Sequence, residues 1–177
     1  AAYFESEETA TAEALSNDGL ERRNLSVDGF EFQLVGRLND TTSVQAGLTL
    51  LDGETDTEVN KSGKVTDFNS PAVYVFPREL PETSASIWVD NQLTEKIGLG
   101  FGMTYQDETL VGNGSDTYLP AFTRFDASAS YDVSGDLSIG LHLENITDEL
   151  YFPHAHGTHQ ATVGAPLTVK LTLNGKF

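Results

Sequence analysis

The carboxy-terminal stretch decides the fold, and it reads Leu167-Thr168-Val169-Lys170-Leu171-Thr172-Leu173-Asn174-Gly175-Lys176-Phe177. Apolar or small residues occupy its odd positions, and polar residues occupy its even positions. A period of two predicts a β-strand with one apolar and one polar face. In an outer-membrane barrel, such a strand turns its apolar face to lipid and its polar face to the lumen, and a final aromatic residue anchors it at the interface. The stretch therefore favours a transmembrane strand over a strand of a soluble β-sandwich.

The composition narrows the class of protein further. Of the 177 residues 38% are hydrophobic, and no apolar run reaches the length of a transmembrane helix, so a membrane protein of this sequence has to be a closed β-barrel. The chain has no cysteines, which excludes disulfides and thiolate metal sites. Its net charge of -17 would repel phosphate and argues against a nucleic-acid partner. No signal peptide is visible, and Ala1-Ala2-Tyr3-Phe4 resembles the interior of a strand, so we expect a fragment.

The same alternation recurs along the chain and gives about eight strands in total. The other segments are 1–4, 22–38, 43–50, 83–89, 97–105, 122–133 and 137–143. Long connections (5–20, 52–81, 106–120 and 145–165) alternate with short turns, which is typical of outer-membrane barrels and not of Greek-key sandwiches. We therefore predict an all-β, antiparallel, up-and-down transmembrane β-barrel with the long connections outside. Tyr131 and Phe177 would then mark the lower membrane interface, and Phe125 and Tyr105 the upper one.

Four short motifs occur in order along these segments. They are Asp28-Gly29-Phe30-Glu31-Phe32, Tyr118-Leu119-Pro120-Ala121-Phe122-Thr123-Arg124-Phe125-Asp126-Ala127, Glu144-Asn145-Ile146-Thr147-Asp148-Glu149-Leu150-Tyr151, and Gly164-Ala165-Pro166-Leu167-Thr168-Val169. Together with the ending of the chain, they resemble the barrels of TonB-dependent outer-membrane receptors of the siderophore-receptor type. Two positions depart from that pattern: Leu167 stands where the family usually has Arg, and Gly175 where an aromatic residue is usual.

The resemblance implies a fold and a cellular location. Residues 1–177 would be the carboxy-terminal third of a 22-stranded barrel in the bacterial outer membrane, without the plug domain of the family. Its partners would be outer-membrane lipid, the barrel assembly machinery and, through the plug, the TonB complex. The assembly signal of such a barrel would correspond to Val169, Leu171, Leu173 and Phe177. An eight-stranded piece would have open edges.

The resemblance also implies a function, which is the binding and import of a ferric siderophore. The candidate cargo-binding residues lie in one outer loop, and they are Tyr151, Phe152, His154, His156 and His159. Aromatic rings can stack on flat groups such as catechols, and three His within six residues could hold a metal or meet a ferric chelate. A similar loop precedes the last strand in the catecholate branch of the family, which singles out His159. The alternative is a solvated loop with incidental histidines.

Other functions have less support. No catalytic residues, resident cofactor or protein metal site are predicted, because the sequence lacks the nucleophile-elbow, zinc-protease and phosphate-loop motifs. A stand-alone eight-stranded barrel with a structural or adhesive role and a soluble β-rich binding domain both remain open. On the inward face, we expect ion pairs between Arg124 and Asp126, between Glu31 and Arg37, and between His142 and Glu144.

Overall fold

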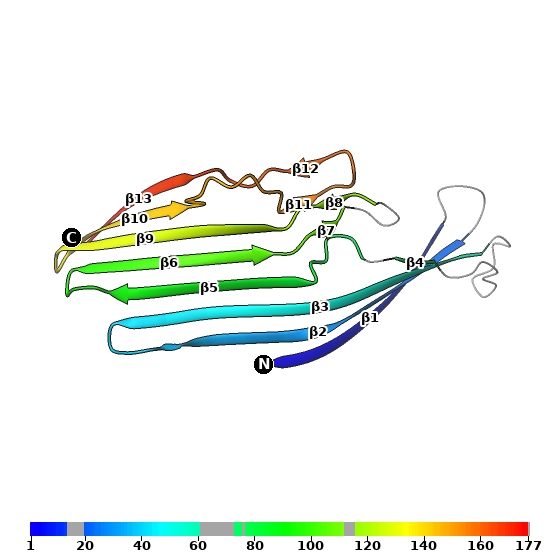
Figure 1. Cartoon of the computed structure of the whole chain (residues 1–177), viewed down its shortest axis with the longest axis horizontal. Coiled ribbons are helices and arrows are strands. Elements are labelled where there is room, and N and C mark those ends of the chain that lie inside the picture. Colours follow the sequence, from blue (N-terminus) through cyan, green and yellow to red (C-terminus); the bar gives the residue numbers. More distant parts are fainter. Residues whose placement is uncertain (14–19, 61–72, 76, 112–115, 177) are drawn as a thin grey trace.

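The chain forms one antiparallel sheet with two small hairpins at one end (Figure 1). The computed structural model describes residues 1–13, 20–60, 73–75, 77–111 and 116–176. The sheet strands are β1 (Ala2–Glu13), β2 (Leu20–Arg37), β3 (Thr42–Asn60), β4 (Val73–Val75), β5 (Thr83–Gln92), β6 (Ile97–Gln106), β9 (Phe122–Ser134), β10 (Leu137–Glu144) and β13 (Thr168–Gly175). The hairpins are β7 (Thr109–Leu110) with β8 (Tyr118–Leu119), and β11 (His154–Ala155) with β12 (Ala161–Thr162).

The topology of the sheet is up-and-down. Its order is β1-β2-β3-β5-β6-β9-β10-β13, so strands that follow one another along this path are hydrogen-bonded neighbours, and β4 adds a short pairing to β3. Strands β1 and β13 lie at the two edges (Figure 1). The eight strands of this path confirm the strand number and the antiparallel order predicted from the sequence. No helix found among the described residues is long and apolar enough to cross a membrane.

One face of the sheet, here called the apolar face, carries exposed large hydrophobic side chains. They include Phe30, Phe32, Leu48, Ile87, Leu99, Phe101, Ile139, Val169, Leu171 and Leu173. In β13 the exposure is highest, and Leu171 is 75% exposed. A soluble protein would bury such a surface under a second layer. Within the part of the chain that the structure describes, no second sheet or helix covers it, which confirms the prediction made from the terminal stretch.

The opposite face, here called the polar face, carries small and polar side chains and one tryptophan. Trp88 is half-buried there and donates a hydrogen bond from Nε1 to Asp90 Oδ1 (2.8 Å). Its ring lies over two glycines of β6: a Cβ on Gly102 would be 2.3 Å from the ring, and one on Gly100 would be 2.6 Å from it. Glycine at these two positions makes room for the indole, so the two glycines allow a close approach between the strands.

The two ends of the sheet differ. At one end, here called the tight-turn end, residues 38–41, 93–96 and 135–136 join consecutive strands. At the other end, here called the loop end, the connections are longer and contain the two small hairpins (Figure 1). This is the alternation of short and long connections predicted from the sequence.

Two of the expected strand boundaries are wrong. Strand β1 continues past Phe4 to Glu13, and β3 continues past Leu50 to Asn60, each paired to β2 along that length. These extensions are rich in Glu, Asp, Thr and Ser, so they lack the alternation that marks a strand with one apolar face. The antiparallel ladder still pairs their backbone amides and carbonyls, which is why they remain strands. Residues 14–19, 61–72, 76 and 112–115, which belong to the expected loops, lie outside the described residues.

The predicted aromatic belts are only partly described. Tyr131 is exposed near the tight-turn end of β9, and Tyr105 and Phe125 are half-buried. Phe125 stacks on Phe101 with ring centroids 6.0 Å apart. Phe177 lies outside the described residues, so the belts stay a prediction.

Candidate functional site at the loop end

The segment 145–167, here called the last loop, is closed at its base by the side chain of Asn145. This side chain is fully buried, and its Nδ2 donates to the carbonyls of Glu149 (2.9 Å) and Ala165 (3.0 Å) while its Oδ1 accepts from the Glu149 amide (2.9 Å). Asp148 Oδ1 accepts from the Leu167 amide (2.9 Å), which ties the two ends of the loop together a second time. Asn145 and Asp148 both have positive φ angles (54° and 51°), a conformation that Asn and Asp tolerate better than most residues.

Strand β9 holds this base in place. Asp126 accepts a hydrogen bond from the Asn145 amide (2.8 Å) with one carboxylate oxygen and pairs with Arg124 (2.9 Å) through the other. The Arg124 guanidinium also donates to the Tyr151 hydroxyl (3.3 Å). The ion pair of Arg124 with Asp126 was predicted from the sequence, and its link to the last loop was not.

Tyr151 is a packed side chain of the loop base. It is only 6% exposed, its ring lies 4.6 Å from that of Phe122, and a Cβ on Gly164 would be 2.2 Å from it. The Gly164 amide donates to the Tyr151 carbonyl (2.8 Å). The structure thus gives Tyr151 a role in closing the loop, and its predicted contact with cargo stays a prediction.

The tip of the last loop is the hairpin β11–β12, and it packs on the hairpin β7–β8. Val111, Leu119 and Ala155 form a small buried cluster between these hairpins, with Phe152 packed against it. In Figure 1 the two hairpins lie together at the loop end of the sheet. The two hairpins at the loop end therefore share a small hydrophobic core.

The predicted histidines all lie at this tip and are exposed. His154 Nε2 is 2.9 Å from the Thr162 hydroxyl, and the rings of His156 and His159 meet edge to face with centroids 5.6 Å apart. Gly157, between them, has a φ of 82°. Among the residues that the structure describes, no group of three or more His, Cys, Asp and Glu is arranged to hold a metal ion.

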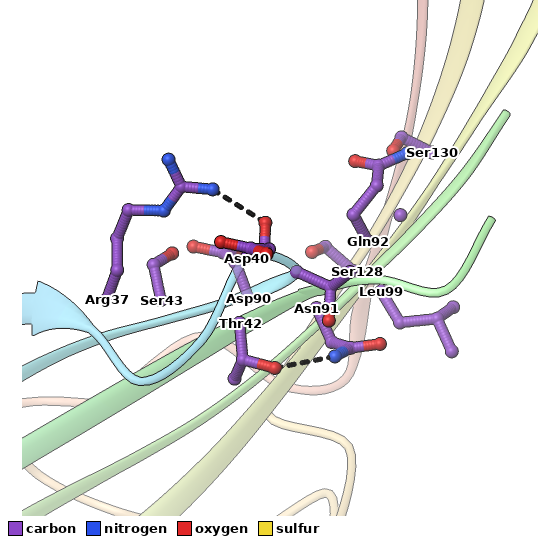
Figure 2. A pocket seen from close by; sticks show the side chains of 12 residues that line it. Arg37, Asp40, Thr42, Ser43, Asp90, Asn91, Gln92, Leu99, Ser128 and Ser130 are labelled. Atoms are coloured by element: carbon purple, nitrogen blue, oxygen red, sulfur yellow. Dashed lines mark hydrogen bonds between the residues drawn. The ribbon is translucent and has the colours of Figure 1, made fainter. Parts of the chain in front are cut away.

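A polar hollow of about 490 Å³ opens on the polar face near the tight-turn end. Figure 2 shows that Asp90, Asn91, Ser128 and Ser130 border it, and that the Asn91 amide reaches the Thr42 hydroxyl (2.8 Å). Arg37 donates here to the backbone carbonyl of Asp40 (2.6 Å). The hollow is polar and open, and it lies at the other end of the sheet from the last loop.

Two of the three predicted ion pairs are wrong. Arg37 and Glu31 are six residues apart on β2 and do not pair, because the Arg37 side chain bonds to the carbonyl of Asp40 in the adjacent turn. Glu144 pairs with Lys170 of the neighbouring strand β13 rather than with His142. Glu144 lies diagonal to Lys170 across the β10–β13 pair, and diagonal neighbours are within reach of long side chains.

Sequence reasoning missed Asn145 and Glu79, which fix the loops. The signal for Asn145 was present in the motif Glu144–Tyr151, where an Asn followed by Asp148 predicts left-handed turn geometry. For Glu79 the chain offers no local signal, because its partners are far away in sequence.

A single sheet with a bare apolar face, a polar face and loops at one end defines an outer-membrane β-barrel wall. Residues 12–146 match the family model described as TonB dependent receptor-like, beta-barrel. The chain therefore belongs to this family of outer-membrane receptors, and it forms part of a barrel.

Three relatives are similar over most of this chain. The probable TonB-dependent siderophore receptor PiuA of Acinetobacter baumannii is 30% identical over 153 residues, which are 85% of this chain and 20% of that protein. The ferrioxamine B receptor of Salmonella typhimurium is 27% identical, over 84% of this chain and 21% of that protein. The catecholate siderophore receptor Fiu of Escherichia coli is also 27% identical, over 85% and 20%. The chain spans about a fifth of the length of the curated relatives it matches.

The fold is similar to that of a solved receptor. The crystal structure of PiuA superposes with a TM-score of 0.74 at 23% identity, covering 99% of this chain and 28% of that one. The sheet therefore has the shape of a barrel segment along nearly its whole length.

Proposed function

We propose that this chain is part of the barrel of a receptor that captures ferric siderophores and imports them with energy from the TonB complex. The observation that carries the proposal is the bare apolar face, combined with long loops that all lie at the loop end and contact one another there. Family membership and the names of the relatives support the same function. In this role the barrel performs no bond chemistry.

The surfaces of the sheet suit the partners of such a receptor. The apolar face contacts outer-membrane lipid, and the polar face lines a lumen that encloses the plug, through which TonB acts. Val169, Leu171 and Leu173 are exposed on the edge strand β13, where the assembly machinery would read them together with Phe177. The strand β10, its neighbour, shields one edge of β13 and leaves the other open for pairing.

The tip of the last loop is the proposed cargo contact in this chain. Phe152 is half-buried and lies against the loop core, while His154, His156 and His159 are exposed at its surface. Neutral imidazoles donate and accept hydrogen bonds, and aromatic edges stack on flat ligand groups. Tyr151 would act from beneath, by holding the base of the loop.

Two classes of cargo are candidates, and they differ in charge. The similarity of the last loop to the catecholate branch favours a ferric catecholate. The charge of the outer stretches favours a neutral or cationic chelate such as a ferric hydroxamate, because residues 5–20, 52–81, 106–120 and 145–165 contain sixteen of the chain's 27 acidic residues and three of its ten basic ones. Such a field repels an anionic ligand over roughly 8 Å at physiological salt.

The test measures cargo binding by the complete receptor in detergent. Calorimetric titration with a ferric catecholate and with a ferric hydroxamate identifies the class, and uptake of radiolabelled iron by iron-starved cells checks transport. We expect His159→Ala to weaken capture about three- to tenfold, the loss of one or two hydrogen bonds. The matched control is Thr158→Ala, which changes an exposed neighbour on the same tip.

Three outcomes would contradict the proposal. Equal affinity of the His159→Ala and wild-type receptors would remove the last loop from the cargo site. Failure of both chelates to bind, with no iron uptake, would leave the stand-alone barrel of structural or adhesive role. Partition of the protein into buffer instead of detergent would support the soluble binding domain.

A further inference from the structure

Glu79 has an unusual position in the connection between β4 and β5. Its φ is 54°, a left-handed conformation that is uncommon for a residue other than Gly, Asn or Asp. Such outliers persist where the surroundings hold them, and they often mark functional sites. The side chain of Glu79 is exposed to solvent, so burial does not explain the conformation.

The contacts of Glu79 reach two other loops. Its amide donates to the carbonyl of Leu110 in β7 (2.9 Å), and its carboxylate oxygen Oε1 accepts from the amide of Ala155 in β11 (3.1 Å). The second bond joins residues that are 76 positions apart in the chain. One residue thus bonds to both of the small hairpins at the loop end.

The segment around Glu79 is itself fixed to the sheet. Pro77 is buried, and a Cβ on Gly53 of β3 would be 3.0 Å from Pro77 and 2.4 Å from Leu80. The Leu51 amide donates to the Glu82 carbonyl (2.8 Å). The segment that carries Glu79 therefore packs on β3, and Glu79 itself bonds to both hairpins.

The position of β11 depends on few contacts other than its bond to Glu79. Ala155 is 4% exposed and belongs to the small core with Val111 and Leu119. The position of β11 thus depends on packing against β7–β8 and on its bond to Glu79. The base of the last loop, at Asn145, fixes the start and end of the segment but leaves this tip to be fixed by its neighbours.

We propose that Glu79 is a positioning residue that joins the β4–β5 connection, the hairpin β7–β8 and the hairpin β11–β12 into one rigid unit, and that it thereby places the cargo-contacting tip. This inference rests on the proposed function for the choice of the tip as the cargo contact. The joining of the three loops is a separate claim, and it can be measured without any cargo.

The experiment uses hydrogen exchange of the complete receptor in detergent, followed on peptides that cover residues 154–162. Glu79→Ala removes the acceptor, and we expect amide exchange there to become about five- to tenfold faster. Glu79→Gln keeps an oxygen acceptor at the same reach, so it should restore near wild-type exchange. Glu79→Gly also removes the acceptor but relieves the backbone conformation, and it should behave like Glu79→Ala.

The control variant is Glu82→Ala, which removes an exposed carboxylate three residues away and should not change exchange. Heat-modifiable migration confirms that each variant forms a closed barrel. Unchanged exchange in Glu79→Ala, or wild-type exchange in Glu79→Gly, would overturn the joining role. The first outcome would mean that the carboxylate holds nothing, and the second that only the backbone matters.

Cargo titration of the same variants separates the two claims. Faster exchange together with a weaker affinity in Glu79→Ala, restored in Glu79→Gln, supports the whole proposal. Faster exchange with unchanged affinity supports the joining of the loops and refutes its role in placing a cargo contact. Neither result depends on a defect in folding, because Glu79→Gln shares the site and retains the bond.

Discussion

The two ends of the sheet are held together in different ways. At the tight-turn end each turn is closed by its own residues: Thr94 Oγ1 accepts from the amides of Lys96 (3.2 Å) and Ile97 (3.1 Å), and Asn39 Oδ1 accepts from the Thr41 amide (2.9 Å). At the loop end the bonds join distant residues, as between Glu79 and Ala155. Each short turn is thus closed by hydrogen bonds among its own residues, to which bonds between neighbouring turns such as Asn91 to Thr42 are added. The loops at the other end depend on bonds between distant residues.

The largest effect should come from Asn145→Ala at the loop end. The change removes three hydrogen bonds of a fully buried side chain and places Ala at a positive φ, so we expect a loss of about 3–5 kcal/mol of local stability. Hydrogen exchange of residues 146–167 and urea unfolding of the complete receptor measure it. The counterpart at the other end is Asn39→Ala, and a loss there as large as that of Asn145→Ala would break the comparison.

A matched glycine pair tests packing at the two ends. Gly164→Ala would bring a Cβ within 2.2 Å of the Tyr151 ring, so we expect a loss of about 1–3 kcal/mol. Gly135→Ala, in a tight turn, meets nothing within 4 Å and should change stability by less than about 0.5 kcal/mol. Thermal unfolding of the two variants decides, and equal melting temperatures would show that the Tyr151 ring yields without cost.

Tyr151→Phe should cause a smaller loss of stability, but one that is felt across the whole last loop. It keeps the ring on Gly164 and removes only the bond between the Tyr151 hydroxyl and Arg124, so we expect a loss of about 0.5–1.5 kcal/mol. Exchange should rise across the last loop, beyond residue 151 itself. If only the amides next to the substitution respond, the loop end is less coupled than its hydrogen bonds suggest.

The smallest effect is expected from Thr94→Ala at the tight-turn end. The hydroxyl holds two amides of an exposed turn, and water can replace it, so the loss should be about 0.5 kcal/mol. Exchange should rise only within residues 93–97. Faster exchange at the other turns or at the loop end would show that the turns are coupled after all.

The same contrast explains what could be predicted from the sequence. The membrane-crossing parts of the strands follow from the period of two, because each has one lipid face and one lumen face, as in Ile97–Gln106. Above the membrane both faces are wet, the alternation disappears, and the extensions of β1 and β3 went unrecognised. The tight turns follow from the spacing of the strands, and their Asn, Asp and Gly residues favour turns through local chemistry.

The site was predicted less completely, for the same physical reason. The loop with its three histidines and its aromatic pair was found, since these residues are adjacent in sequence. In the structure Tyr151 is buried and the histidines are exposed, and this difference in burial could not be predicted from the residue types in the loop. Arg124–Tyr151 and Glu79–Ala155 are contacts across 27 and 76 positions, and no single stretch of the chain signals them.

Trp88, the chain's one tryptophan, gives the receptor an internal fluorescent probe. Its indole lies on the polar face, over Gly100 and Gly102, and is hydrogen-bonded to Asp90. Where Trp88 is the sole tryptophan of the receptor, quenchers dissolved in water should dim its emission while brominated acyl chains should not. Its emission would then report on what occupies the polar face of the sheet.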